Sequence, residues 1–134
     1  MDREKNWDWV TARKACTARV MFEALRSGAK ANVISRNALD DEGSKDPPPF
    51  TVIDRPPNGF TVSDSRGRAR RVVDFDLDGH VIHVSRTIVT VTSSFDVSVV
   101  LNDQGICKLK VRAESELDEW QVLKRALEPL FFHD

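Results

Sequence analysis

Several features that usually point to a function are scarce or missing in this chain. Its 134 residues include only two cysteines, three histidines and no tyrosine. Cys16 and Cys107 belong to neither a CxxC pair nor a cysteine and histidine cluster, so the ligand spacing of a structural zinc site is absent. Because the sequence shows no secretion signal, we expect both cysteines to be buried free thiols rather than a disulfide.

Long apolar runs are also absent. No segment approaches the roughly 18 consecutive apolar residues of a membrane-spanning helix, and the first ten residues, MDREKNWDWV, are charged where a signal peptide would be apolar. Twenty-one acidic residues balance 20 basic ones, which gives a net charge of −1. No overall field therefore draws the chain to nucleic acid or to an anionic membrane, and we expect a cytoplasmic location.

The sequence motifs of common enzymes are missing as well. There is no GxSxG, no glycine-rich phosphate loop and no cysteine with an identifiable histidine partner. His80 and His83 form an HxxH, but residues three apart on a strand point to opposite faces, so a shared metal ion is not expected. The sequence predicts no catalytic residue, cofactor or metal site, and it favours a non-enzymatic role while leaving catalysis open.

What is present predicts one α+β domain over residues 1–134. The chain is 40% hydrophobic and 31% charged, a composition typical of soluble globular proteins, and it has no long internal repeat. Between Phe50 and Ala113, short alternating segments are separated by turn residues. This pattern predicts an antiparallel meander of about six or seven strands, with an N-terminal and a C-terminal helix packed on the sheet.

The N-terminal helix is predicted to begin at Asn6 or Asp8 and to end near Gly28. The following residues, ANVISRN, are interpreted as a short strand, and residues 39–48, rich in acids and prolines, as a mobile loop. Besides its main apolar stripe, the helix has a second, smaller apolar face that includes Trp9. Trp9 is therefore a candidate contact for a partner.

The C-terminal helix is predicted to begin at Ser115 as N-cap and to kink or stop near Pro129. Its continuous apolar stripe is expected to lie on the sheet and comprises Leu117, Trp120, Leu123, Leu127, Leu130 and Phe131. A hairpin with a three-residue loop, Asp103 to Gly105, is predicted before this helix. Its register follows from the alternation of apolar residues on the two strands. The predicted pairs are Leu101 with Cys107, Val99 with Leu109, Val97 with Val111, Ser98 with Lys110 and Asp96 with Arg112.

The segment VVDFDLDGHVIHVS poses the most direct chemical question. Asp74, Asp76 and Asp78, followed by Gly79, match the first positions of an EF-hand calcium loop, but the closing glutamate is replaced by Ser85. The flanks are also strand-like where helices are needed. We therefore favour a hairpin with an Asp78–Gly79 turn, and weak calcium binding is the alternative.

That hairpin places Asp74 opposite His83 and Asp76 opposite Val81, on the face away from the core. A carboxylate that faces an imidazole raises the pKa of the imidazole. These side chains are therefore candidates for a contact with solvent or with a partner.

A second candidate surface is the segment RGRARR, which carries Arg66, Arg68, Arg70 and Arg71. Guanidinium groups suit phosphate and carboxylate recognition. However, no aromatic residues alternate with them for base stacking, so nucleic-acid binding is not expected from this pattern. A charged strand edge that discourages aggregation is the simpler interpretation.

These observations favour a non-catalytic binding or adaptor module that engages another protein. The candidate contact residues are Trp9, Arg66, Arg68, Arg70, Arg71, Asp74, Asp76 and His83. One alternative is an apolar-ligand carrier or enzyme with a pocket between the sheet and the C-terminal helix, lined by residues such as Trp120, Phe75 or Phe95. The other is nucleic-acid contact through the arginine segment. The oligomeric state does not follow from the sequence.

Overall fold

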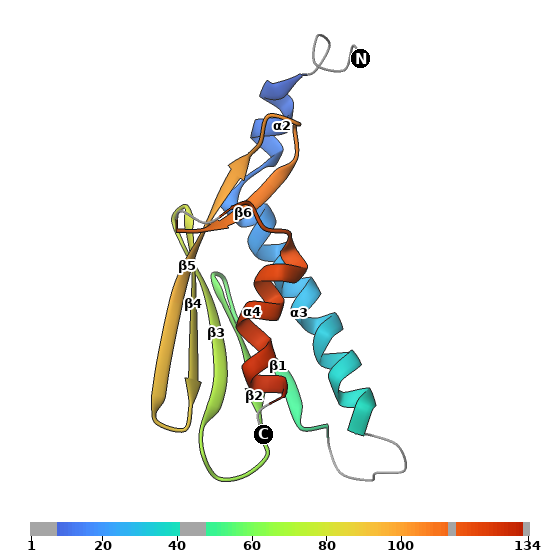
Figure 1. Cartoon of the computed structure of the whole chain (residues 1–134), viewed down its shortest axis with the longest axis vertical. Helices are drawn as coiled ribbons and strands as arrows, with labels where there is room; N and C mark the ends of the chain where they lie inside the picture. Colours follow the sequence, from blue (N-terminus) through green and yellow to red (C-terminus); the bar gives the residue numbers. More distant parts are fainter. Residues whose placement is uncertain (1–7, 41–47, 113–114, 133–134) are drawn as a thin grey trace.

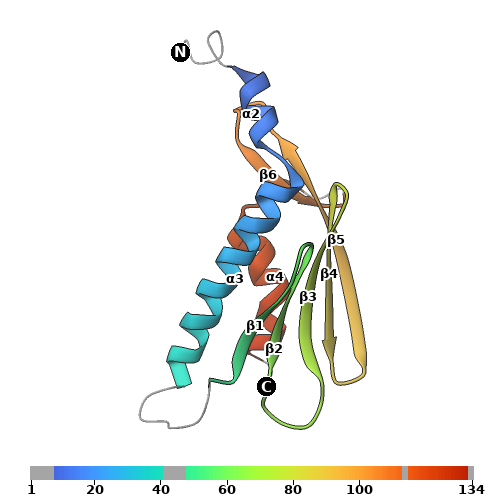
Figure 2. The same ribbon diagram turned by 180° about the vertical axis from the view of Figure 1, so that it is seen from behind.

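The structure is a computed structural model that describes residues 8–40, 48–112 and 115–132. Within these residues it contains one six-stranded antiparallel sheet, in which successive strands of the chain are neighbours from β1 to β6. Two helices, α3 and α4, lie on one face of the sheet, and a short helix, α2, projects beyond its end (Figures 1 and 2). The predicted α+β meander is confirmed.

The elements are bounded as follows. The strands are β1 (Phe50–Arg55), β2 (Gly59–Asp64), β3 (Arg71–Asp78), β4 (Val81–Ile88), β5 (Val91–Leu101) and β6 (Cys107–Val111). The helices are α2 (Trp9–Ala15), α3 (Ala18–Asp40) and α4 (Glu119–Phe131). No helix in the described ranges is both long and apolar enough to cross a membrane.

The core lies between the sheet and the two long helices. Alternation along the strands directs one set of apolar side chains toward the helices, and Phe60 and Phe75 stack at its centre with ring centroids 4.5 Å apart. The opposite face of the sheet is largely polar. The main buried side chains of the sheet are Phe50, Phe60, Val62, Val73, Phe75, Ile82, Val84, Val97 and Leu109, and those of the helices are Phe22, Leu25, Val122, Leu123, Leu127 and Leu130.

The N-terminal helix differs from its prediction. Asp8 is the N-cap of α2 and accepts a hydrogen bond from the backbone N–H of Thr11 at 3.1 Å, but α2 ends at Ala15. The next helix, α3, continues through Gly28 and through the predicted strand to Asp40. Gly28 lies inside α3 rather than at its end, at the place where α4 approaches: a Cβ atom there would lie 2.6 Å from Leu123 Cδ1.

The predicted mobile loop at 39–48 is only partly described. Leu39 and Asp40 belong to α3, and β1 follows from Phe50. Residues 41–47 lie outside the described residues.

The β3–β4 hairpin has the predicted faces but a different register. Its turn consists of Gly79 and His80, so Asp76 lies opposite His83 and Asp74 opposite Ser85. The predicted pairing of Asp74 with His83 is therefore wrong by two positions, a shift that keeps every side chain on its face. Gly79 has φ of 62°, as the first central residue of a type II′ turn requires, whereas the prediction placed it second.

The β5–β6 hairpin has the predicted register, with Leu101 opposite Cys107, Val99 opposite Leu109 and Val97 opposite Val111. Pairing stops there, so the predicted pair of Asp96 with Arg112 does not form part of the ladder. Arg112 has φ of 56°, which turns the chain away from β5.

The C-terminal helix begins later than predicted. Its N-cap is Asp118 rather than Ser115, and the backbone N–H of Asp118 donates to Gln121 Oε1 at 2.7 Å. The helix continues through Pro129 to Phe131. Trp120 is 61% exposed and is not part of the buried stripe, which is formed by Val122, Leu123, Ala126, Leu127, Leu130 and Phe131.

The two cysteines form a disulfide, which contradicts the predicted free thiols. Cys16 lies between α2 and α3 and Cys107 begins β6, with their Cα atoms 5.4 Å apart. The bond joins positions separated by 91 residues and attaches the start of α3 to the edge strand of the sheet. Sequence spacing gave no indication of this contact, because it depends on how helix and sheet pack.

Candidate protein-binding surfaces

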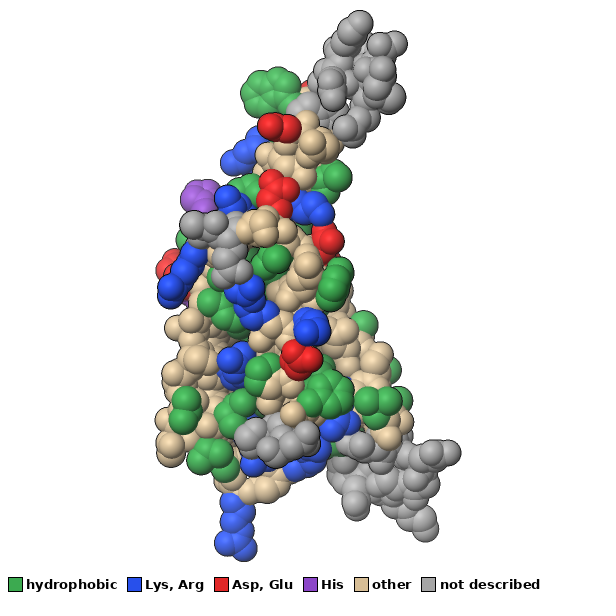
Figure 3. Space-filling model, in the orientation of Figure 1, with side chains coloured by type: hydrophobic (Ala, Val, Ile, Leu, Met, Phe, Trp, Pro, Cys, Tyr) green, Lys and Arg blue, Asp and Glu red, His purple; other side chains and the backbone are tan. Residues whose placement is uncertain are grey.

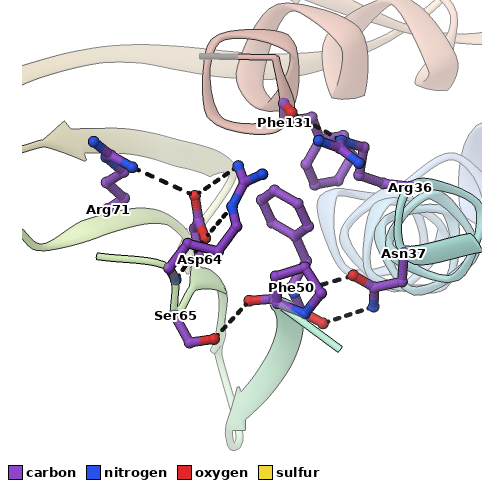
Figure 4. Close-up of polar contacts among 9 residues, drawn as sticks. Arg36, Asn37, Phe50, Asp64, Ser65, Arg71 and Phe131 are labelled. Atoms are coloured by element: carbon purple, nitrogen blue, oxygen red, sulfur yellow. Dashed lines mark hydrogen bonds and ion pairs between the residues drawn. The ribbon is translucent and has the colours of Figure 1, made fainter. Parts of the chain in front are cut away.

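The arginine segment between β2 and β3 does not form a single basic patch. Asp64 is buried, and it accepts hydrogen bonds from Arg66 Nε at 3.0 Å and Arg66 Nη2 at 3.1 Å, while Arg71 Nη1 lies 4.0 Å away. Figure 4 shows Asp64 with Arg71 on one side and Phe50 on the other. Of the four arginines, Arg68 and Arg70 are exposed. The other two are engaged with a buried carboxylate.

The same region connects the sheet to both long helices. The Arg66 guanidinium lies over the Phe50 ring at 4.7 Å, and the Asn37 side chain of α3 bonds both the N–H and the C=O of Phe50. Arg36 Nε donates to the carbonyl oxygen of Phe131 at 2.8 Å near the end of α4 (Figure 4). Arg36, Arg66 and the buried Asp64 therefore belong to a network of contacts that holds the sheet and the helices together.

Asp74 and Asp76 lie on the polar face of the sheet and hold Arg55 of β1. Arg55 Nη1 donates to Asp76 Oδ1 at 2.8 Å, and Arg55 Nη2 lies 3.5 Å from Asp74 Oδ1. Thr61 donates to Asp74 as well. The guanidinium is therefore the cation that these two carboxylates share, and among the described residues no group of three or more potential ligands is arranged to hold a metal ion.

His83 belongs to a separate contact on that face. Its Nδ1 is hydrogen-bonded to Asp96 of β5, and its Nε2 lies 3.6 Å from Asp78 Oδ2. The hydrogen bond to Asp96 is the largest cause that raises the pKa of His83 above its usual value, and Asp78 adds to it. The predicted carboxylate–imidazole contact exists, but with Asp96 and Asp78 in place of Asp74.

Helix α2, which begins at Trp9, lies at the opposite end of the molecule from the connection between β2 and β3 that contains the arginine segment (Figure 1). Trp9 is 59% exposed on α2, a helix with no buried residue. A groove of about 500 Å³ separates it from the end of β5 and is also lined by Arg13 and Val99. The predicted contact residues are therefore spread over both ends and the polar face, and the structure does not bring them together into one site.

The predicted pocket between sheet and C-terminal helix is not formed by its named residues. Phe75 is buried against Phe60, Trp120 lies on the outer surface of α4, and Phe95 lines a hollow whose other walls come from β4, β5 and Arg112 rather than from α4. An apolar groove of about 320 Å³ lies instead between α3 and α4 on the outside of the molecule, lined by Leu39, Leu127 and Phe132 among others. Figure 3 shows this side, where hydrophobic and charged side chains alternate over the helices.

The most distinctive surface is an open edge of β5, which sequence analysis did not identify. β4 pairs with β5 from Val91 to Ser98, whereas β6 pairs only with Val97 to Leu101. Among the described residues, the segment Val91 to Asp96 therefore has a neighbouring strand on one side only. Figure 1 shows this half of β5 at the margin of the sheet, below the point where β6 leaves it. We call this segment the β5 edge.

The alternation of hydrogen bonds shows which peptide groups the β5 edge presents. At the end of the β5–β6 ladder, the N–H of Asn102 donates to the C=O of Ile106 at 3.0 Å. In an antiparallel ladder every second residue directs its N–H and C=O to the same side. When residues are counted back from Asn102 in steps of two, the count reaches Asp96, Ser94 and Thr92. The peptide groups of these three residues therefore point outward from the sheet.

The other two edges of the sheet are each contacted at one residue, and β1 also ends in the charged pair Asp54 and Arg55. On β1, Asn37 of α3 bonds the backbone of Phe50, while on β6 Leu109 exchanges two backbone hydrogen bonds with Leu117, at 2.7 and 3.0 Å. The β5 edge contains no lysine, arginine or proline, the residues that usually discourage strand addition. Val91, which begins it, is 70% exposed.

Comparisons with protein-family models, curated proteins and solved structures found no match to this chain.

Proposed function

We propose that this protein is a non-catalytic binding module whose β5 edge receives an extended segment of another protein. The observation that carries the proposal is the open edge from Val91 to Asp96, where β5 extends beyond the end of its pairing with β6. A strand added to such an edge gains main-chain hydrogen bonds, and alternate pockets then select its side chains. The outward peptide groups of Thr92, Ser94 and Asp96 supply the required donors and acceptors.

The side chains beside the edge suit a partner with apolar residues on one face. Val91, Ser93 and Phe95 point to the helix side of the sheet, because Val97 of the same strand is buried there. The Arg125 guanidinium of α4 lies over the Phe95 ring at 5.9 Å and limits the depth of this surface. The remaining predicted contacts, above all Trp9, are retained as secondary candidates.

The alternative of an apolar-ligand carrier is supported by the groove between α3 and α4. Its walls include Leu39, Leu127, Phe131 and Phe132, and its volume of about 320 Å³ lies at the lower end of the usual range for ligand pockets. Nucleic-acid contact has less support, since Arg66 and Arg71 are engaged with Asp64.

We propose that the protein is located in the cytoplasm. The Cys16–Cys107 disulfide weighs against it, because disulfides persist mainly in oxidising compartments. Alkylation of the protein in intact cells, followed by mass spectrometry, distinguishes a reduced cysteine pair from a disulfide. A reduced pair indicates the cytosol.

Selection of extended peptides tests the proposal. The protein is attached to a surface at low density, so that its copies stay apart, and is exposed to a library of unstructured peptides. We expect to recover peptides that bind the wild type and the Ser94→Ala variant but not Ser94→Pro. Proline removes an outward N–H without affecting the ladder to β4, whereas alanine keeps it.

The binding peptides are then examined by amide hydrogen exchange. Protection of the Thr92, Ser94 and Asp96 amides on binding supports strand addition. Peptides that bind Ser94→Pro as well as the wild type, or a selection that yields none, contradict the proposal. Circular dichroism of each variant first establishes that it keeps the native fold.

A further inference from the structure

We propose that the segment received by the β5 edge is the same edge of a second copy of this chain. This inference rests on the proposed function, since it names the partner of that edge. Two copies would pair antiparallel about a two-fold axis at Ser93 and form one continuous sheet. An interface of this kind is isologous, because the same surface is used by both subunits.

The sequence of the β5 edge is self-complementary about Ser93. An apolar residue lies two positions away on each side, Val91 and Phe95, and a hydroxyl residue lies one position away on each side, Thr92 and Ser94. In the antiparallel arrangement Phe95 faces Val91 of the second copy, and Thr92 faces its Ser94. Aromatic with β-branched pairs and hydroxyl pairs are among the favourable cross-strand combinations.

No charge opposes this pairing. The segment from Val91 to Phe95, VTSSF, is uncharged, and Asp96 is already held by His83. The net charge of the whole chain is −1, so repulsion between two copies is weak. A strand of unrelated sequence would match the apolar and hydroxyl positions only by chance, whereas a second copy matches all of them.

The hydrogen-bonding pattern fits the same register. Thr92 and Ser94 direct their peptide groups outward. The axis at Ser93 places Thr92 opposite Ser94 of the second copy, and Ser94 opposite its Thr92. Each of these two hydrogen-bonded pairs exchanges two backbone hydrogen bonds. Ser93 then faces Ser93 of the second copy as a non-hydrogen-bonded pair, in which Cα atoms lie about 4.5 Å apart.

The end of β6 limits the register. With the axis at Ser93, strand β5 of the second copy begins at its Val91, opposite Phe95, and its preceding turn lies next to Asp96. Thr90 of the second copy is then level with Asp96, directly before Val97, where Val111 of β6 begins to pair. Arg112, which has a positive φ, follows the last paired residue of β6 and lines a hollow beside the edge together with Ser94, Phe95 and Asp96. A register shifted toward β6 would bring the turn against Val111.

The first test measures association of the full chain. Sedimentation of the wild type over a wide concentration range is expected to show a monomer–dimer equilibrium. Ser93→Lys places two like charges opposite each other at the axis and should raise the dimer Kd about tenfold or more. Thr51→Lys, an exposed hydroxyl-to-lysine change on β1 at the other edge of the sheet, is the matched control and should leave the Kd unchanged.

The second test measures the register. Both native cysteines are engaged in the disulfide, so Ser93→Cys provides a single free thiol at the axis. Non-hydrogen-bonded pairs have the Cα separation that a disulfide needs. Under a mild thiol oxidant Ser93→Cys should form a covalent dimer much faster than Thr51→Cys, the matched control.

The outcomes separate this inference from the proposed function. A wild type that stays monomeric, a dimer that Ser93→Lys does not weaken, or equal cross-linking of Ser93→Cys and Thr51→Cys overturns the second copy as partner. If peptides are nevertheless recovered that Ser94→Pro fails to bind, strand addition stands with a different partner. If a dimer with this register forms but no peptide is recovered, the edge pairs with a second copy and not with a segment of another protein. If neither peptides nor a dimer are found, both proposals are wrong.

Discussion

At the scale of single residues, Arg86 compensates for a proline that would otherwise weaken helix α4. Pro129 lacks the N–H that would bond the carbonyl oxygen of Arg125 in a regular helix. Arg86 of β4 supplies a donor in its place, with Nη1 3.1 Å from that oxygen. This contact lets α4 continue through Pro129 to Phe131, where the sequence predicted a kink or a stop.

His83 is the residue for which the structure predicts a pH dependence. Its pKa is raised chiefly by the hydrogen bond to Asp96, so protonation is favoured in the folded state relative to an unfolded value of about 6.5. The resulting stabilisation is complete below the unfolded pKa and is lost as the pH rises through the folded pKa. The NMR titration of the His83 ring should therefore have a midpoint above the ordinary value. Asp96→Asn should lower that midpoint, and an unchanged midpoint would show that Asp96 is not the cause.

At the scale of elements, the packing of α4 on α3 depends on Gly28. The helix contains a glycine where a longer side chain would meet Leu123, which is buried in the core. A glycine inside a helix costs about 0.5–1 kcal/mol relative to alanine. The close packing of α3 on α4 therefore outweighs the low helix propensity of glycine at this position.

Gly28→Ala tests this balance. The added methyl group forces the terminal methyl group of Leu123 to shift, and because Leu123 is only 3% exposed we expect a cost of about 1–3 kcal/mol, more than the gain in helix propensity. We expect a net loss of about 1 kcal/mol in the free energy of unfolding, measured with urea. In a Leu123→Ala background the methyl group has room, so the same substitution should become neutral or stabilising. A stabilising effect in the wild-type background would contradict the proposed contact.

At the scale of the whole molecule, the disulfide connects the two layers of the fold. It attaches the junction of α2 and α3 to β6 across 91 residues of chain. A cross-link that closes a loop of this length restricts the unfolded chain by roughly 4–5 kcal/mol in the chain-entropy model. The cross-link also fixes the end of the sheet from which α2 and Trp9 project.

Removal of the disulfide should lower stability without changing the sheet. We expect the reduced protein, and a Cys16→Ser and Cys107→Ser double variant, to unfold at lower urea concentration than the oxidised protein, with a loss of up to about 4 kcal/mol. The double variant should not respond to reductant, which serves as the control. If alkylation of the purified, denatured protein labels two free thiols, the cross-link is absent.

Local patterns in the sequence determined the strand alternation and the register of β5 and β6 as far as Val97 with Val111, and they restricted the first cap to Asn6 or Asp8, because each depends on residues close together in the chain. The pairing of Cys16 with Cys107, the role of Gly28 and the exposure of Trp120 were decided by tertiary structure, since each depends on how helices pack on the sheet. The open edge of β5 was also decided by tertiary structure. Its residues read as an ordinary strand, and only the departure of β6 at Arg112 leaves their peptide groups without a neighbour among the described residues.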